Sequence, residues 1–309
     1  MIKHLTHNKI DKSRWDDCIR HSFNGNIYAW SWYLDIVHPN WEALVENDYE
    51  RVMPLCGNKK LGINYLFQPF FTQQHGIFSS SYLNEEIVQK FIDAIPKKYR
   101  LTEIRLNSYN KVDYDLNYFK RHRNIELDLI SNYQSIYSNY SSNTKRNLNK
   151  ANKNTLYINR DINPEHVIKL FRENKGKEVK HWNNKEYQRL INLTHTAIER
   201  ECCFVYGVND ENNNLVAGAI FMVSHDKIVF LFSGVDKSNK DTNAWTFLID
   251  SVIKEFSGTP LIFDFEGSDN EGLARFYKGF GGKEVYYPEI KRNNFKGIFK
   301  FAYKLMRKE

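Results

Sequence analysis

The chain lacks the features that mark several simple classes of protein. Its four cysteines, Cys18, Cys56, Cys202 and Cys203, form no CxxC pair, and no histidines follow at finger spacing. A structural zinc site is therefore not expected. Seven prolines and 15 glycines among 309 residues exclude a collagen-like or linker-like chain. We interpret the cysteines as buried thiols in a reduced, cytoplasmic compartment.

Long apolar runs are also missing. The longest clean apolar stretch runs from Ala217 to Val223, with Gly218 inside it. This is far short of the roughly 20 residues that span a bilayer. The first residues, Met1 to Leu5, open no apolar leader segment. We therefore expect a cytoplasmic protein with no membrane span and no bound metal.

The chain does have ample material for a packed core. Hydrophobic residues make up 41% of it and aromatic residues 15%, which favours a folded protein over disorder. Lys and Arg number 44 against 37 Asp and Glu, so the net charge is 44 − 37 = +7 at pH 7. This charge permits an anionic partner such as RNA but does not require one. The length corresponds to about two domains.

The first half of the chain has mixed α and β patterns. We expect helices at 13–22, 27–38 and 84–95, and strands at 41–45, 51–56, 61–67, 102–106 and 125–130. Gly57-Asn58 is predicted to be a hairpin turn. A basic stretch at 133–154 is either a solvated helix or a surface that contacts an anionic substrate. We place the domain boundary near its start, which gives domains 1–130 and 131–309.

The second half has a clearer order, β, α, α, β, β, β, α, β, α, β. The expected ranges are 156–161, 163–171, 185–200, 203–208, 215–223, 227–234, 244–256, 260–265, 270–280 and a last strand from 283. Three consecutive strands predict an antiparallel meander. A helix between two apolar strands then predicts a right-handed crossover to a parallel pair. We expect the sheet to splay where these two arrangements meet.

Three local stretches carry a resemblance to a known family. The run Asn270-Glu271-Gly272-Leu273-Ala274-Arg275-Phe276-Tyr277-Lys278-Gly279-Phe280-Gly281 resembles the GNAT acyltransferase motif in which an Asn opens a helix and an aromatic pair precedes a Gly. Phe263-Asp264-Phe265-Glu266-Gly267-Ser268 and Thr144-Lys145-Arg146-Asn147-Leu148-Asn149-Lys150-Ala151 are similar to segments of the FemABX-like branch. The resemblance implies an α/β (α+β) fold of two tandem GNAT-like domains, each a mixed, mainly antiparallel sheet flanked by helices.

The resemblance also implies a reaction and its substrates. A FemABX-like protein would be an N-acyltransferase that moves an acyl or aminoacyl group from acyl-CoA or aminoacyl-tRNA to a small-molecule or peptide amine. The donor would lie against the second domain at the end of its fourth strand. The residues matched to the donor-binding positions are Gly234, Val235, Lys240, Asn243, Ala244 and Asn270.

The loop at these donor-binding positions departs from the ordinary GNAT pattern. GNAT enzymes use glycines there, so that backbone amides can approach the pyrophosphate of CoA. In this chain Asp241, Asn243 and Trp245 occupy those positions. A carboxylate beside a phosphate and a bulky ring where backbone should meet the ligand both argue against the standard mode of CoA binding. Aminoacyl-tRNA is the alternative donor.

Candidate catalytic residues follow from the chemistry of acyl transfer. Tyr277 matches the GNAT position for the acid that protonates the leaving group, although it could equally pack its helix. Asp264 and Glu266 alternate with Phe263 and Phe265, so both acids should share one face of a strand. Such a pair could raise one pKa toward that of a base, and Glu266 is the better candidate. Capping of the next helix is the alternative role.

Substrate contacts are predicted at four further residues. Lys145 and Arg146 lie in the basic stretch, and His75 and His181 are expected in loops. Two alternatives to an enzyme stay open. One is a non-catalytic GNAT-like module that binds an anionic ligand such as RNA. The other is a degenerate domain that serves only in assembly. The sequence does not indicate the oligomeric state.

Overall fold

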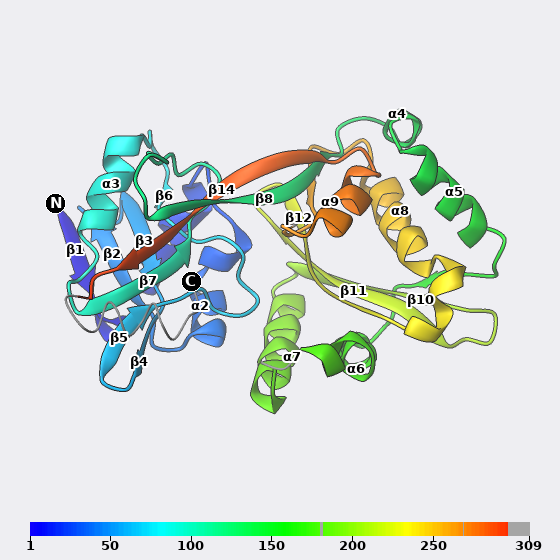
Figure 1. Cartoon of the computed structure of the whole chain (residues 1–309), viewed down its shortest axis with the longest axis horizontal. Helices are drawn as coiled ribbons and strands as arrows, with labels where there is room; N and C mark the ends of the chain where they lie inside the picture. The colour runs from blue at the N-terminus through cyan, green and yellow to red at the C-terminus, as the bar shows by residue number, and fades with distance from the viewer. Residues whose placement is uncertain (180–181, 268, 296–309) are drawn as a thin grey trace. The chain divides into compact units, whose positions relative to one another are not determined.

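A computed structural model describes residues 1–179, 182–267 and 269–295. Contacts divide the chain into two compact units (Figure 1). Unit 1 consists of Met1–His122 together with the segment that begins at Tyr286, and unit 2 is Arg123–Val285. The chain enters unit 2 within strand β8 (Phe119–Asp128) and leaves it within strand β14 (Lys283–Asn293). The sequence predicts a single domain boundary near residue 130. In the structure β14 returns the chain to unit 1, so unit 1 consists of two separate segments of the sequence.

Unit 1 contains two groups of hydrogen-bonded strands and three α-helices within its described residues. Strands β1 to β3 and β6 form a sheet in the order β1-β2-β3-β6, and a second group has the order β4-β5-β7-β14. The bounds are β1 Ile2–Leu5, α1 Lys12–His21, α2 Ser31–Val37, β2 Glu42–Glu46, β3 Arg51–Leu55, β4 Gly57–Lys60, β5 Ile63–Leu66, β6 Phe78–Ser79, α3 Glu85–Asp93 and β7 Tyr99–Arg105. Short 3-10 helices precede α1 and α2, at His7–Lys9 and Ile27–Ala29.

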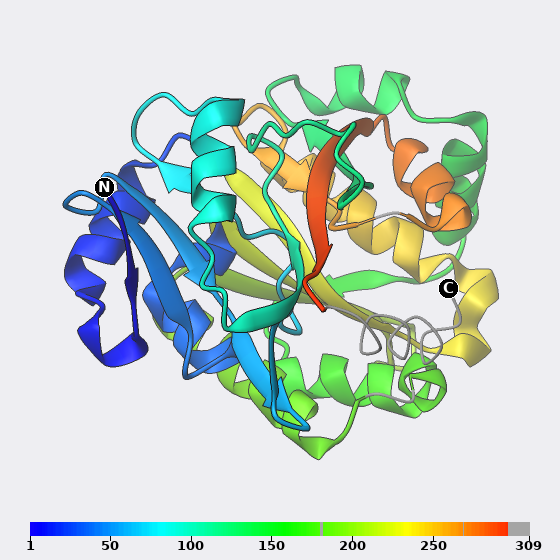
Figure 2. The same cartoon turned by 60° about the vertical axis from the view of Figure 1, so that its left-hand side comes forward.

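Both faces of the four-stranded sheet are buried. Successive strand residues point to opposite sides, so neighbouring residues of one strand pack into different cores. Ala43 and Val45 of β2 pack with helices α1 and α2, around the fully buried Trp15. Leu44, between them in the sequence, packs with α3 and with strands of the second group. Helix α3 lies alongside the strands of unit 1 in Figure 2.

The predicted turn at Gly57-Asn58 is wrong, because these residues begin strand β4. The two-residue turn lies instead at Leu61-Gly62, between the paired residues Lys60 and Ile63. Leu61 has φ +49° and Gly62 φ +80°, the pair of positive angles that a tight hairpin turn of this twist requires. Gly57 is needed for a different reason. A Cβ at this position would lie 2.6 Å from the Tyr99 hydroxyl oxygen.

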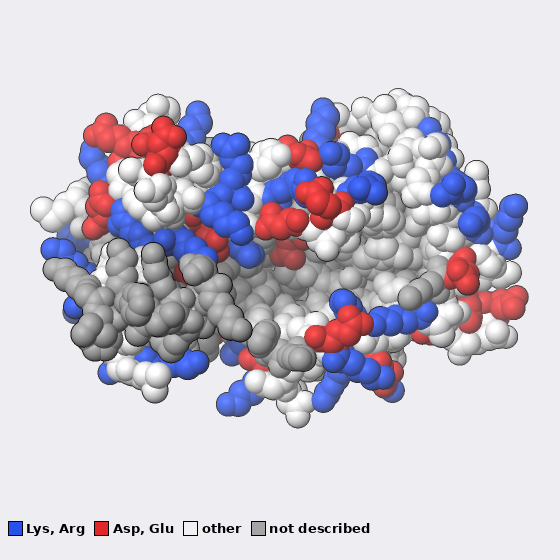
Figure 3. Space-filling model, in the orientation of Figure 1, with Lys and Arg blue, Asp and Glu red and all other residues white. Residues whose placement is uncertain are grey.

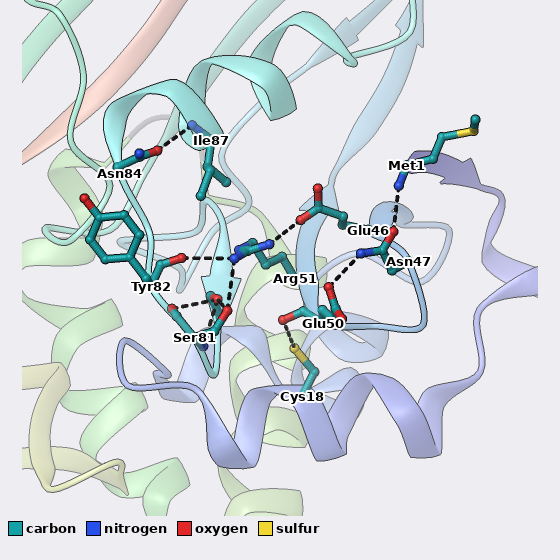
Figure 4. Close-up of polar contacts among 11 residues, drawn as sticks. Met1, Cys18, Glu46, Asn47, Glu50, Arg51, Ser81, Tyr82, Asn84 and Ile87 are labelled. Atoms are coloured by element: carbon teal, nitrogen blue, oxygen red, sulfur yellow. Dashed lines mark hydrogen bonds and ion pairs between the residues drawn. The ribbon is translucent and has the colours of Figure 1, made fainter.

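The start of helix α3 is fixed by a half-buried arginine (Figure 4). Nη1 of Arg51 on β3 lies 2.6 Å from Oε2 of Glu46 on β2. Nη2 donates to the hydroxyl of Ser81 at 3.0 Å and to the carbonyl of Tyr82 at 3.1 Å. Asn84 then caps the helix, accepting a hydrogen bond from the amide of Ile87 at 2.9 Å. Arg51 therefore links the sheet to the segment that leads into α3.

Unit 2 follows the element order that the sequence predicted. Its elements are α4 Tyr133–Ser138, α5 Ser142–Ala151, β9 Tyr157–Asn159, α6 Pro164–Glu173, α7 Asn184–Glu199, β10 Cys203–Asn209, β11 Leu215–Ser224, β12 Lys227–Val235, α8 Ala244–Phe256, β13 Ile262–Asp264 and α9 Glu271–Lys278. Short 3-10 helices lie at Lys175–Glu178 and Lys237–Thr242. The strand order is β8-β13-β12-β11-β10-β9. Strands β10 to β12 form the expected antiparallel meander, and β12 and β13 form the expected parallel pair.

Helices cover both faces of the unit 2 sheet (Figure 1). Helix α8 packs on one face, over an aromatic-rich core that includes Phe221, Phe230 and Phe263. Helices α6 and α7 cover the other face. Gly218 and Gly234 pair across β11 and β12. A Cβ at Gly234 would lie 2.5 Å from the Val167 carbonyl oxygen, so this glycine lets α6 approach the sheet.

None of the helices in the described ranges is long and apolar enough to cross a bilayer.

Candidate active site

Strands β12 and β13 separate close to where they begin to pair. Their parallel pairing covers only Lys227–Val229 against Ile262–Asp264, while β12 continues to Val235. Beyond Asp264 the chain turns through Glu266 and Gly267, with φ of +52° and +76°. The amide of Phe265 donates to the carbonyl of Ile125 on β8 at 3.0 Å, so the chain follows β8 and not β12. The expected splay of the sheet therefore begins at Asp264.

Two carboxylates and an ammonium meet at this point. Asp264 pairs directly with Glu126 in the β13–β8 register. Nζ of Lys227, on β12, lies 2.6 Å from Oε1 of Glu126 and 3.7 Å from Oδ2 of Asp264. Only 5% of the Asp264 side chain is exposed, against 14% for Glu126 and 18% for Lys227. Glu126 and Lys227 are thus the members of this carboxylate cluster that a ligand can reach more easily.

Asn124 holds the carboxylate cluster in place from the side of β8. Its Nδ2 donates to Oδ1 of Asp264 at 2.8 Å, across 140 positions in the sequence. Its Oδ1 accepts from the amide of Gly267 at 2.8 Å. The amide of Glu266 also donates to Oδ1 of Asp264, at 2.9 Å. Asp264 is therefore a positioning residue whose acceptors are occupied by its neighbours.

The environment raises the pKa of Glu126. Burial contributes most, and the nearby charge of Asp264 adds to it, while Lys227 and Asn124 oppose the shift. A carboxyl group whose pKa moves toward neutrality is a suitable general base or acid. The sequence alone does not reveal Glu126 as a site residue, because only the β13–β8 register brings it beside Asp264. The available signal was its position on a predicted strand, two residues after Asn124.

Glu266 does not continue the strand alternation from which the sequence predicts a carboxylate pair with Asp264. Strand alternation ends with β13 at Asp264, and Glu266 lies in the left-handed turn that follows. It nevertheless lies close to the predicted acid, because its charge contributes to the raised pKa of Tyr277. Asp264 and Glu126 form the pair instead.

Tyr277 on α9 is a core residue with 4% of its surface exposed. Its ring stacks on Phe265, with centroids 4.6 Å apart, and meets the edge of Phe230 at 6.4 Å. Burial is the main cause of its raised pKa, so the phenol stays protonated at neutral pH. None of the residues that the structure describes forms a hydrogen bond to its hydroxyl. Among the described residues this hydroxyl is therefore not engaged, and it is available to donate to an acceptor, which is what the acid role requires.

The segment between β12 and the positions matched to CoA binding uses its amides internally. Asp236 accepts from the amide and hydroxyl of Ser238 at 2.9 and 2.8 Å and from Nδ2 of Asn239 at 2.8 Å. The amide of Lys237 donates to Oδ1 of Asn174 at 3.0 Å. Burial alone would raise the pKa of Asp236, but these hydrogen bonds lower it below its usual value. An anion would have to displace this carboxylate to reach the amides.

Several of the remaining donor-binding candidates have structural roles. Gly234, beside Val235 at the end of β12, admits helix α6. Asn243 has φ +55° just before α8, and the amide of Ala244 donates to the Thr242 hydroxyl at 3.3 Å. Asn270 caps α9 by accepting from the amide of Leu273 at 3.0 Å. Lys240 lies in the 3-10 helix before α8.

The two basic candidates lie on helix α5, along which Lys and Arg side chains are visible in Figure 3. Lys145 donates to the carbonyl of Ser138 at 2.8 Å and lies 5.3 Å from the centroid of Tyr137. Arg146 donates to Oδ1 of Asn143 at 2.5 Å. The start of α5 and the end of α9 border a cavity of about 580 Å³. Its lining residues are Ser141, Asn143, Thr144, Gly272, Arg275, Phe276, Lys278 and Gly279.

This cavity lies between two motifs that are far apart in the sequence, the basic stretch that contains α5 and the Asn270–Gly281 motif that contains α9. The amide of Ser141, at the start of α5, donates to the carbonyl of Gly279 at 2.8 Å. A Cβ at Gly279 would lie 2.3 Å from the hydroxyl oxygen of Thr144. The glycine after Lys278 therefore allows α5 to pack on the end of α9.

The sequence predicts substrate contacts at two histidines. His75 is buried in unit 1, where it forms an isolated bridge with Leu106. Burial lowers its pKa to about 3, so it is neutral at physiological pH. As predicted, His75 lies in no helix or named strand, but its side chain is buried. His181 lies outside the described residues. Among the residues that are described, no group of three His, Cys, Asp or Glu side chains is arranged to hold a metal ion.

Comparisons with known proteins identify the fold. No protein-family model matches the chain, and a search of curated proteins finds no match. The structure of FemX is similar with a TM-score of 0.66 and 14% identity, over 98% of this chain and 99% of that one. L-PGS from Bacillus licheniformis has a TM-score of 0.52 and 10% identity, over 96% of both chains. A tandem GNAT protein from the clavulanic acid biosynthesis pathway has a TM-score of 0.50 and 9% identity, over 96% of this chain and 100% of that one.

These similarities confirm the predicted fold class. The chain has the FemABX- and GNAT-like fold, with mixed, mainly antiparallel sheets flanked by helices. At such low identities the likeness extends to the fold alone.

Proposed function

We propose that the protein is an N-acyltransferase that moves an acyl or aminoacyl group from an activated donor to the amine of a small molecule or peptide. The observation that carries this proposal is the carboxylate cluster of Glu126, Asp264 and Lys227 at the separation of β12 and β13. A carboxylate with a raised pKa at the opening of a splayed sheet supports a base that receives the proton of an attacking amine.

The proposed reaction assigns a role to each group. The amine nitrogen attacks the carbonyl carbon of the donor, and its proton passes to the Glu126 carboxylate. The bond between the carbonyl carbon and the oxygen or sulfur of the leaving group then breaks. The Tyr277 hydroxyl, which no described residue engages, supplies the proton that the leaving group takes up. Asp264 raises the pKa of Glu126 and positions the turn at Glu266.

The loop after β12 supports an aminoacyl ester over acyl-CoA as the donor. Its amides at Lys237 and Ser238 are held by Asn174 and Asp236, and the amide of Ala244, at a matched position, donates to the Thr242 hydroxyl. A CoA pyrophosphate would have to displace these acceptors. The basic side chains along α5 provide a surface that suits the phosphates of a tRNA.

Ligand binding by the whole chain tests this proposal. We expect aminoacyl-tRNA to raise the melting temperature with a steep salt dependence, and acetyl-CoA to leave it unchanged. Glu126→Gln should keep this response but lose acyl transfer to an amine. Glu173→Gln, which removes an exposed carboxylate on α6, is the matched control and should retain both. Stabilisation by acetyl-CoA, with transfer unaffected in Glu126→Gln, would refute the proposed donor and the proposed base together. Specific RNA binding without transfer by the wild-type chain would favour the non-catalytic module.

A further inference from the structure

Unit 1 contains a cavity separate from the carboxylate cluster, which lies in unit 2. Its volume is about 440 Å³, within the range of small-molecule sites. We call it the Arg121 pocket. Its lining residues are Glu85, Ser108, Asn110, Lys111, Val112, Tyr114, Arg121, Tyr286 and Pro288. They come from the start of α3, the segment between β7 and β8, and the unit 1 ends of β8 and β14, over which Figure 3 shows Lys and Arg side chains.

Buried amide side chains hold the wall of this pocket rigidly. Oδ1 of Asn110 accepts from the amide of Ile77 at 2.8 Å, and its Nδ2 donates to the Ile77 carbonyl at 3.0 Å. Asn107 accepts from the amide of Tyr109 at 3.1 Å. The amide of Ser108 donates to Oε1 of Gln74 at 3.1 Å. A wall that is ordered before any ligand arrives does not lose conformational entropy on binding.

The guanidinium of Arg121 packs against two aromatic rings. Its guanidinium carbon lies 4.5 Å from the ring centroid of Tyr114 and 5.5 Å from that of Tyr286. Both rings are partly exposed, 37% for Tyr114 and 45% for Tyr286. Rings that cover the face of a guanidinium leave its N–H donors at the edge available. Among the described residues, no carboxylate forms an ion pair with Arg121.

Lys111 provides a second cation in the same lining. It too forms no ion pair within the described parts of the chain. Arginine offers a planar fork that matches an oxyanion in two places, and lysine adds a point charge. A phosphate monoester carries about 1.5 to 2 negative charges at pH 7, which matches two cations better than the single charge of a carboxylate does.

We propose that the Arg121 pocket binds the phosphate group of a small phosphate ester. The phosphate oxygens accept hydrogen bonds from Arg121 and Lys111. Glu85 also lines the pocket. Its carboxylate accepts a hydrogen bond from a hydroxyl or amine group next to the phosphate in the ligand. The tyrosine rings provide apolar walls for the organic part. This site does not depend on the acyltransferase proposal.

The test is a titration of the full-length chain with inorganic phosphate, followed by backbone amide NMR at constant ionic strength. We expect saturable shifts at Lys111, Tyr114, Arg121 and Tyr286. Arg121→Gln should weaken binding about tenfold, because it removes the charge and the fork. Arg121→Lys should recover part of the affinity. Glu85→Gln should strengthen binding of inorganic phosphate, because it removes a like charge.

Lys3→Gln is the matched control, since Lys3 is exposed on β1 and does not line the pocket. It removes one positive charge of unit 1 and should leave the affinity unchanged. Lys111→Gln gives a second test of the pocket in case Arg121→Gln disturbs folding, and it should weaken binding. Equal affinities in Lys3→Gln, Lys111→Gln and Arg121→Gln would overturn the proposal, as would binding of acetate as tight as that of phosphate.

Discussion

Glu126 and Asp264 face each other on neighbouring antiparallel strands, and Lys227 reaches both from a third strand. The pair is far apart in the sequence, yet Asp264 raises the pKa of Glu126. Asp264 keeps its partner protonated to higher pH, and Asn124 keeps Asp264 in place. This relationship makes the pKa of Glu126 a property that can be changed without altering Glu126 itself.

Replacing Asp264 by Asn should lower the pKa of Glu126. The substitution removes a negative charge beside Glu126 and leaves the positive charge of Lys227 in place. The remaining charge therefore favours the ionised form of Glu126. A carboxyl ¹³C titration would show the midpoint of Glu126 moving to lower pH. If Glu126 acts as the base, the rising limb of a pH–rate profile should move in the same direction. An unmoved midpoint would show that burial alone sets the pKa.

Tyr277→Phe should lower turnover while ligand binding and folding stay nearly intact. The substitution keeps the ring that stacks on Phe265 and removes the hydroxyl, which no described residue uses. Tyr277→Ala should instead cost roughly 3 to 5 kcal/mol of unfolding free energy, because it leaves a cavity in the core. Turnover and chemical denaturation of both variants separate the two roles. Full activity in Tyr277→Phe would exclude Tyr277 as the acid.

Much of the fold was predictable from the sequence, because its elements have strong local patterns. The order of elements from β9 to β14, the meander and the parallel pair were all predicted. The sequence predicts the hairpin turn at the wrong place, because glycine and asparagine are common turn residues and leucine is not. Only the close approach of Tyr99 to Gly57 shows that this glycine serves packing within a strand.

The hairpin turn itself can be stabilised. Leu61 has φ +49° and is 92% exposed, so its side chain gains no burial that would offset the left-handed conformation. Leu61→Asn should raise the unfolding free energy by about 1 kcal/mol. Gly62→Ala should lower it by a similar amount, because Gly62 also has a positive φ. Thermal denaturation of both variants measures this, and a destabilised Leu61→Asn would contradict the assigned turn.

Gly279→Ala should destabilise unit 2 by about 1 to 3 kcal/mol. The added Cβ would lie 2.3 Å from the Thr144 hydroxyl oxygen, in the contact between α5 and α9. Adding Thr144→Ala should recover part of the loss. Gly272→Ala in the same helix is the control and should be neutral or stabilising by up to about 1 kcal/mol, because Gly272 is exposed. Equal effects of the two glycine substitutions would argue against this contact.

Stability should fall as the pH drops below 6.5, in part through His75. The unfolded chain protonates this side chain near pH 6.5, whereas burial lowers the folded pKa to about 3. Between these values the unfolded state binds the extra proton, so each pH unit costs up to about 1.4 kcal/mol. Urea denaturation of wild type and His75→Gln at several pH values should show a smaller slope in the variant. Parallel slopes would mean that His75 titrates normally.

The candidate site was less predictable than the fold, because its geometry depends on long-range strand pairing. Asp264 was found from its place on an apolar strand. Its pairing with Glu266 was assumed from alternation, which the left-handed turn at Glu266 ends. Glu126 and Lys227 join Asp264 only through the register of three strands. The interactions that occupy the loop amides, such as Asp236 with Ser238, also depend on a local conformation that the residue types do not specify.

The return of β14 to unit 1 has a consequence for biosynthesis. A ribosome translates β7 early, but β14, which pairs with β7, emerges only after the whole of unit 2 has been made. At about 5 to 20 residues per second, that edge of β7 stays without its final neighbour for seconds. Unit 2 has all its residues before unit 1 does. The part of the protein that is translated first is therefore the part that completes its fold last.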